Sequence, residues 1–272
     1  MSAVGSGAPA AGSVSNTKLL IIGIIGAFIG IYATQCSLGP IGNLLACLGG
    51  VCAIVWGANS IRSVASYGLG TGVPSIGYMS LSIGVIGAVA GLVICANILK
   101  IALLGPIVGF IIALVFGVIV GLIGTKIIGM KIPIMVRCTA EIGGAAALSV
   151  IAFAAAIAGT LDLFTILITV FTTGFIALLL IMNTMAVQHP FNACLGPNED
   201  QARTLALAKA TGFLAMVIVG ILSLITFDLI SCLLIVIVGL LLWYVSFRKF
   251  VKLSYGAAAS VRWTGLWPKV EE

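Results

Sequence analysis

Long apolar runs without charged residues repeat along almost the whole chain. An α-helix that crosses a lipid bilayer needs ~20 consecutive, predominantly apolar residues. Only 7% of the 272 residues are charged, against roughly 25% in soluble domains, so the chain cannot cover a water-facing surface. This excludes a cytosolic enzyme, a nucleic-acid-binding module and a disordered regulator, and it predicts an all-α, polytopic membrane protein. The eight predicted helices lie at about residues 19–36, 41–60, 75–98, 101–125, 139–159, 163–187, 207–227 and 229–247.

Short and long connections alternate between the predicted helices. Links of a few residues pair the helices at Ser37–Pro40, Leu99–Lys100, Thr160–Asp162 and Phe227–Asp228. Longer polar segments join one pair to the next at Ile61–Pro74, Lys126–Cys138 and Gln188–Ala206. This alternation predicts four helical hairpins in series within a transmembrane helical domain at residues 18–250. Residues 1–17, rich in Ala, Gly and Ser, are expected to form a flexible N-terminal tail, and residues 251–272 a cytoplasmic C-terminal tail.

Basic residues divide sharply between the two sides of these hairpins. Only Lys100 lies on the side of the short links, beside Asp162 and Asp228. Cytoplasmic segments of membrane proteins carry an excess of Lys and Arg. We therefore expect both termini and all three long connections to be cytoplasmic. The basic residues on that side are Lys18, Arg62, Lys126, Lys131, Arg137, Arg203, Lys209, Arg248, Lys249, Lys252, Arg262 and Lys269.

Glycine pairs spaced four residues apart occur in several predicted helices. Small residues let helix backbones approach closely in a bilayer, where apolar side chains gain little from contact with one another. We favour packing within the chain, and packing against partner subunits is the alternative. The pairs are Gly26/Gly30, Gly87/Gly91, Gly105/Gly109 and Gly117/Gly121.

No motif of a known enzyme active site is present. The chain lacks a P-loop, a dinucleotide-binding glycine motif after a strand, a nucleophile elbow and an HExxH zinc motif. Its seven cysteines include no CxxC pair, and it has only one histidine, His189. A Cys/His zinc site is therefore not expected. The sequence therefore predicts no catalytic residue and no metal site.

Glu141 is the one acidic residue that we place inside a predicted helix, about one turn from its start. Carboxylates at membrane depth are costly and usually face a protein interior, a cavity or an ion path. At this shallow depth the side chain could instead reach the interface, and a carboxylate near a helix N-terminus is stabilised by the helix dipole. Both an ion-binding role and this structural role remain open.

Four polar residues follow one face of the sixth predicted helix: Thr165, Thr169, Thr172 and Asn183. Their steps of four, three and eleven residues keep them together at 3.6 residues per turn. Their oxygens could bind a hard cation such as Na⁺, or they could hydrogen-bond to neighbouring helices, which is the commoner use.

Two further groups of polar residues are expected on the cytoplasmic side. The segment 188–200 contains His189, Asn192, Glu199 and Asp200, and it either docks a soluble partner or provides a capped start for the next helix. Arg62, Lys131, Arg137 and Arg203 could line a cytoplasmic mouth that attracts an anion, although the simpler interpretation is that they only determine topology.

Several long strings of residues are more specific than hydropathy. They are VCAIVWGANSIRSVASYGLGTGVPSIGY at 51–78, KIPI at 131–134, CTAEI at 138–142, NTMAVQHPFNACLGPNE at 183–199 and ASVRWTGLWPK at 259–269. With these strings the chain strongly resembles the C subunit of the tetrahydromethanopterin S-methyltransferase complex of methanogenic archaea. The resemblance runs almost from end to end.

The resemblance implies a membrane subunit of a sodium-pumping methyltransferase. In that family the complex moves a methyl group from a methylated pterin to the thiol of coenzyme M through a corrinoid cobalt, and it exports Na⁺. The corrinoid belongs to a different subunit, so no cofactor is expected on this chain, and Na⁺ is a candidate ligand. The implied partners are other multispan subunits, the corrinoid-carrying subunit and membrane lipid, and the basic loops would attract anionic coenzyme M. A scaffold without an ion path and a stand-alone secondary transporter are the alternatives.

Overall fold

The computed structural model describes residues 13–65, 72–171, 200–226 and 228–258, and all regular structure within these ranges is helical. Short π-helical turns extend three helices at Ile94–Ile98, Ile123–Ile127 and Leu167–Phe171, and 3₁₀ turns lie at Ala102–Leu104 and Ser223–Thr226. The helices are α1 (Asn16–Ala33), α2 (Pro40–Ala65), α3 (Gly72–Val93), α4 (Gly105–Leu122), α5 (Met135–Ala158), α6 (Leu163–Ile166), α8 (Gln201–Leu222) and α9 (Leu229–Ala258).

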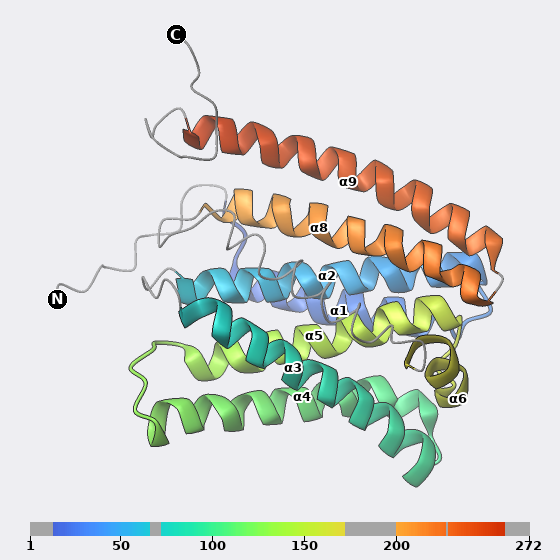
Figure 1. The fold of residues 1–272 in the computed structure, drawn as a ribbon, viewed down its shortest axis with the longest axis horizontal. Helices are drawn as coiled ribbons and strands as arrows, with labels where there is room; N and C mark the ends of the chain where they lie inside the picture. The colour runs from blue at the N-terminus through green and yellow to red at the C-terminus, as the bar shows by residue number, and fades with distance from the viewer. Residues whose placement is uncertain (1–12, 66–71, 172–199, 227, 259–272) are drawn as a thin grey trace.

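The predicted hairpins are confirmed for three pairs of helices. Helices α1 and α2, α3 and α4, and α8 and α9 are each antiparallel neighbours joined by a short connection (Figure 1). Seven helices of the described residues are long and apolar enough to cross a membrane. The predicted sixth helix, 163–187, begins as α6 and continues as the π-helical turn to Phe171, and its remainder lies outside the described residues.

Helix α5 is the central element of the bundle. It packs against α2, α3 and α4, and every residue from Ile142 to Ile157 is buried (Figure 1). This stretch is rich in alanine, with Phe153 and Leu148 among its larger buried side chains. Small side chains allow several helices to contact α5 closely, as is typical of packing in a bilayer. The centre of the described bundle is therefore filled by apolar groups.

The glycine pairs pack within the chain, as favoured from the sequence. A Cβ atom added to Gly91 on α3 would lie 2.2 Å from the backbone nitrogen of Gly109 on α4, and one added to Gly117 would lie 2.6 Å from the Cα atom of Ala140 on α5. In the first hairpin, a Cβ atom at Gly30 would lie 2.4 Å from the carbonyl oxygen of Leu45. These glycines permit backbone contacts that any side chain would prevent.

Several helix boundaries differ from the predicted ones. Helix α2 continues to Ala65 rather than 60, α5 begins at Met135 rather than 139, α8 begins at Gln201 rather than 207, and α9 continues to Ala258 rather than 247. The predicted boundaries followed the ends of the apolar runs. A helix does not end where hydropathy falls, because Arg and Lys are good helix formers and the backbone hydrogen bonds continue beyond the bilayer. The segment predicted as a tail from 251 therefore begins inside α9.

Candidate functional site

Polar side chains gather at the two ends of the bundle. We call one end the basic end, because it holds Arg62 at the end of α2, Lys131 before α5, and Arg203 in the first turn of α8. Contacts join these helix ends: the Cys138 thiol of α5 donates to the carbonyl oxygen of Ser60 on α2 at 3.5 Å. The opposite end holds the short connections with Asp162 and Asp228. Arg137, in the first turn of α5, lies at the same end, so the structure brings the four predicted anion-attracting residues to one end of the molecule.

Glu141 forms an ion pair within its own helix. Its Oε1 atom lies 3.2 Å from Nε of Arg137, one turn earlier on α5, and the two side chains are 17% and 49% exposed. Because α5 begins at Met135, Glu141 lies in the second turn. An i,i+4 ion pair on a helix contributes only about 0.2–0.5 kcal/mol, so the contact is weak enough to exchange. The Glu141 carboxylate also offsets part of the positive charge of Arg137. Arg137 should therefore attract an anion less strongly than the exposed Lys131 does.

An amide network joins three helices at the basic end, and two of its side chains, Asn59 and Gln201, are buried while Asn16 is exposed. Asn59 of α2, only 2% exposed, donates to Oδ1 of Asn16 on α1 at 2.9 Å and accepts from Nε2 of Gln201 on α8 at 2.9 Å. Gln201 also exchanges two hydrogen bonds with the backbone of Val14, at 2.8 and 2.9 Å. These bonds tie the start of α8 to the first hairpin. Sequence reasoning missed this amide network.

A second polar cluster joins helices at the opposite end. Asn43 of α2 donates from Nδ2 to Oγ of Ser231 at 3.0 Å and to Oδ2 of Asp228 at 3.3 Å. Asp228 in turn accepts from the Ser231 backbone N–H at 2.9 Å and so caps the start of α9. Thr226 donates to the carbonyl oxygen of Ile157 on α5 at 3.3 Å. The first hairpin, α5 and the last hairpin are therefore fastened together at this end as well.

The threonines of the predicted sixth helix make local hydrogen bonds. Thr165 donates from its backbone N–H and its hydroxyl to Asp162, both at 2.8 Å, and these bonds hold the pKa of Asp162 below its ordinary value. The Thr169 hydroxyl donates to the Thr165 carbonyl at 2.7 Å. Thr172 and Asn183 lie outside the described residues. The one-face prediction assumed a continuous α-helix, and the π-helical turn at Leu167–Phe171 breaks that periodicity.

Most of the predicted docking segment also lies outside the described residues. His189, Asn192 and Glu199 belong to that part of the chain. Asp200 is described, and its Oδ2 atom accepts from the backbone N–H of Arg203 at 3.3 Å, which makes it the N-cap of α8. The interpretation as a capped helix start is therefore confirmed for Asp200, and docking at the segment stays a prediction.

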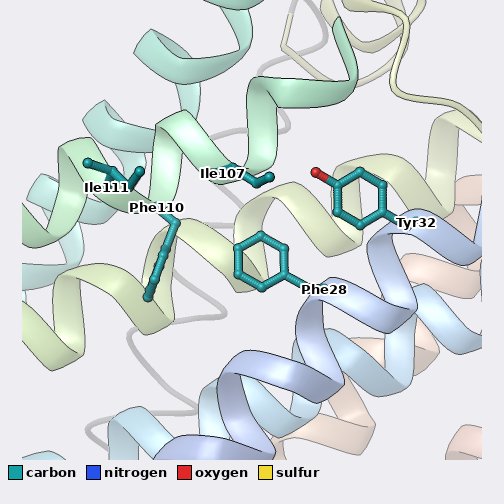
Figure 2. A pocket seen from close by; sticks show the side chains of 5 residues that line it. All are labelled: Phe28, Tyr32, Ile107, Phe110 and Ile111. Atoms are coloured by element: carbon teal, nitrogen blue, oxygen red, sulfur yellow. The ribbon is translucent and has the colours of Figure 1, made fainter.

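An apolar groove of about 420 Å³ opens between α1 and α4. Figure 2 shows the rings of Phe28 and Tyr32 facing Ile107, Phe110 and Ile111 across it. The Tyr32 hydroxyl donates to the carbonyl oxygen of Leu103 at 2.7 Å, and the ring of Phe28 meets that of Phe110 edge-on with centroids 5.7 Å apart. A groove with this lining suits hydrocarbon and offers no set of oxygens to a cation.

The described helices thus form a multispan bundle, with an apolar centre, that is fastened by polar contacts at both ends. Within the described ranges, no three His, Cys, Asp or Glu side chains gather where they could hold a metal ion. Helices of this length and hydropathy define the fold as that of a multi-pass membrane protein. The family model for the C subunit of tetrahydromethanopterin S-methyltransferase matches residues 1–271, and the chain belongs to this family.

Curated relatives match over nearly the full length of both proteins. The tetrahydromethanopterin S-methyltransferase C subunits of Methanothermobacter marburgensis and Methanothermobacter thermautotrophicus are 57% and 55% identical to this chain, and each match covers 99% of both sequences. The C subunit of Methanosarcina mazei is 40% identical over 100% of this chain and 99% of its own length. The resemblance drawn from the loop strings is confirmed, and the chain is a subunit of a methyltransferase complex.

Proposed function

We propose that this chain is an integral membrane subunit of the Na⁺-translocating methyl-tetrahydromethanopterin:coenzyme M methyltransferase complex. It helps to form the membrane core that couples methyl transfer to coenzyme M with Na⁺ export. The whole-chain match to the family of C subunits carries this proposal. The multispan bundle supports it, because its apolar centre suits a membrane core. The corrinoid is carried by a partner subunit, and the other multispan subunits complete the core.

The energy for transport comes from the partners of this chain. Moving one Na⁺ outward against ~150 mV costs roughly 3.5 kcal/mol, at about 2.3 kcal/mol per charge per 100 mV. The sequence carries no nucleotide-binding or redox motif that would release this energy. Methyl transfer on another subunit therefore supplies it, and the membrane helices respond by changing between two arrangements.

We propose that the Na⁺ path runs along the surface of this chain, where the chain contacts a partner subunit. Hard cations require oxygen ligands, whereas the buried residues of α5 from Ile142 to Ile157 are apolar except for Ser149. Glu141 is the candidate ligand at the basic end, where its weak pairing with Arg137 can be exchanged for Na⁺. Thr165, Thr169, Thr172 and Asn183 are the further candidates along the sixth predicted helix.

Glu141→Gln should reduce Na⁺ transport by the assembled complex about tenfold, as expected when a contact to a charged group worth about 1.5 kcal/mol is lost. The amide keeps the shape of the side chain but removes the charge that would bind Na⁺. Sodium uptake into liposomes and the Na⁺ dependence of methyl transfer are the two measurements. Arg137→Gln is the matched control, because it breaks the same ion pair but leaves the carboxylate. Unchanged transport and unchanged Na⁺ dependence in Glu141→Gln would remove Glu141 from the path.

We propose that the basic end faces the cytoplasm, because cytoplasmic segments carry the excess of Lys and Arg. Cys36 offers a direct test, since it is exposed in the turn between α1 and α2 at the opposite end. A membrane-impermeant maleimide should label Cys36 in intact cells and not in inverted vesicles. A cysteine introduced at Lys131 should show the reverse, in a Cys36→Ser, Cys194→Ser background. Labelling of Cys36 from the cytoplasmic side would contradict this orientation.

The same orientation would bring Arg62, Lys131, Arg137 and Arg203 to the side where soluble anions arrive. We propose that they raise the local concentration of coenzyme M, whose sulfonate is anionic. Docking of the corrinoid-carrying subunit at His189, Asn192, Glu199 and Asp200 would bring the methyl donor to the same side.

A further inference from the structure

Helix α9 has one side packed and the other side open. It packs against α8 and α2 at the edge of the bundle (Figure 1), while Leu233, Ile237 and Leu241 on its other side are exposed. Its 30 residues, Leu229–Ala258, include no Asp or Glu. The open side is therefore apolar and, towards its C-terminal end, positively charged.

The length of α9 locates these charges relative to the bilayer. The helix starts at the short connection with Asp228, and at 1.5 Å per residue Arg248 lies about 28 Å further along. The hydrocarbon core of a bilayer is about 30 Å thick. Arg248, Lys249 and Lys252 therefore reach the headgroup layer of the leaflet at the basic end when the helix starts at the opposite surface.

Aromatic residues share this stretch of α9 with the charges. The rings of Trp243 and Phe247 stack with centroids 5.7 Å apart, and the ring of Phe250 lies 6.4 Å from that of Phe247. The guanidinium of Arg248 lies 5.6 Å from the centroid of the Tyr244 ring. Trp and Tyr prefer the level of the headgroups, and the cation–π contact holds the guanidinium at that level.

The cations of this segment are available to an external anion. Arg248, Lys249 and Lys252 are exposed, and none forms a salt bridge with a carboxylate in the part of the chain that the structure describes. Basic residues next to a membrane are each attracted to anionic headgroups, whereas an apolar partner helix would leave three cations unpaired. Charge complementarity thus selects an anionic lipid over an apolar protein surface.

We propose that the segment Trp243–Tyr255 of α9 is a binding site for anionic phospholipid headgroups at the basic end of the bundle. The phosphate binds to Arg248, Lys249 and Lys252, and the hydrocarbon chains lie along the exposed apolar side of α9. The proposal does not depend on Na⁺ transport by this chain.

Photo-crosslinking in the assembled complex tests this site. The complex is placed in nanodiscs of equal parts phosphatidylglycerol and phosphatidylcholine, with one of the two lipids carrying a diazirine, and crosslinked peptides are identified by mass spectrometry. Phosphatidylglycerol should label residues 243–255 on the order of fivefold more than phosphatidylcholine, as expected from the attraction of basic residues to anionic lipid. The variant Arg248→Gln/Lys249→Gln/Lys252→Gln should lower this ratio to near one.

Two further variants make the result specific. Arg248→Lys/Lys249→Arg/Lys252→Arg keeps the charge and should keep the preference even if the glutamine variant assembles poorly. Lys100→Gln, at the opposite end, should leave the preference unchanged. Equal labelling by both lipids in the wild-type complex would overturn the proposal. Absence of lipid labelling at 243–255 would also overturn it, since a partner protein would then cover the segment.

Discussion

Replacing Gly91 by alanine should destabilise the chain by about 3 kcal/mol, the upper range for overpacking in a close-packed interior. The added Cβ atom would lie 2.2 Å from the backbone nitrogen and 2.3 Å from the Cα atom of Gly109, and 2.8 Å from the carbonyl oxygen of Gly105. All three are backbone atoms, so no side chain can rotate away, and α3 and α4 must move apart. Unfolding of the purified chain in mixed micelles, followed by circular dichroism, measures the loss.

Ile86→Ala is the control for this substitution. Ile86 lies on the same helix but is 58% exposed, so its truncation should change stability by less than about 1 kcal/mol. If Gly91→Ala is as stable as the wild type, α3 and α4 do not make this backbone contact. The interpretation of the glycine pairs as intrachain packing would then be wrong.

Replacing Asn59 by alanine should cost about 2 kcal/mol, near the upper end for hydrogen bonds between helices in membranes. The side chain is the centre of the amide network, and its removal leaves the Asn16 carbonyl and one Gln201 N–H without these partners. Gln201 is buried, and an unpaired buried polar group costs more than the net gain of a hydrogen bond, whereas the carbonyl of the exposed Asn16 can bond to water. The start of α8 should then separate from α1 and α2, and proteolysis near residue 200 should become faster.

Gln35→Ala is the matched control for Asn59→Ala. Gln35 also carries an amide, but it is exposed and donates only to the adjacent Thr34 hydroxyl. Its replacement should change neither the unfolding transition nor the proteolysis rate. Equal behaviour of the two variants would show that the amide network does not hold the first hairpin to α8.

The helices and hairpins could be predicted because the bilayer makes the same demand on every span. A run of about 20 apolar residues has no other stable form in lipid than a helix, and a link as short as Leu99–Lys100 forces antiparallel neighbours. Helix ends beyond the bilayer are less constrained by hydropathy. This is why α9 continues through Arg248, Lys249 and Lys252. It is also why α5 begins at Met135, before the apolar run, so that Glu141 lies in the second turn of the helix.

The polar contacts between helices could not be predicted, because they join residues that are distant in sequence. Asn59 meets Gln201, and Asn43 meets Asp228 and Ser231, only after the first and last hairpins have packed together. A lone asparagine in an apolar run was the available signal, since polar side chains in a membrane helix seek partners. Their partners depend on the order of the hairpins around α5, and helical periodicity does not specify this order.

The hydrogen bonds of the candidate ion ligands could not be predicted from the sequence either. The spacing of Thr165 and Thr169 predicted a shared helix face, but the hydroxyls bind locally to Asp162 and to the backbone. The π-helical turn at Leu167–Phe171, which contains Thr169, could not be inferred from 3.6-residue spacing. For Glu141, the nearby Arg137 at the preceding turn was visible in the sequence, and the i,i+4 pairing follows from helix geometry.

Sodium transport by the methyltransferase complex with and without this chain tests the central claim most directly. The complex is reconstituted in liposomes from its other subunits alone and, in parallel, with this chain added back, and Na⁺ uptake and methyl transfer to coenzyme M are measured together. We predict that omission abolishes Na⁺ uptake coupled to methyl transfer and that adding the chain restores it. Full coupled Na⁺ uptake by the complex that lacks this chain would contradict the proposed role.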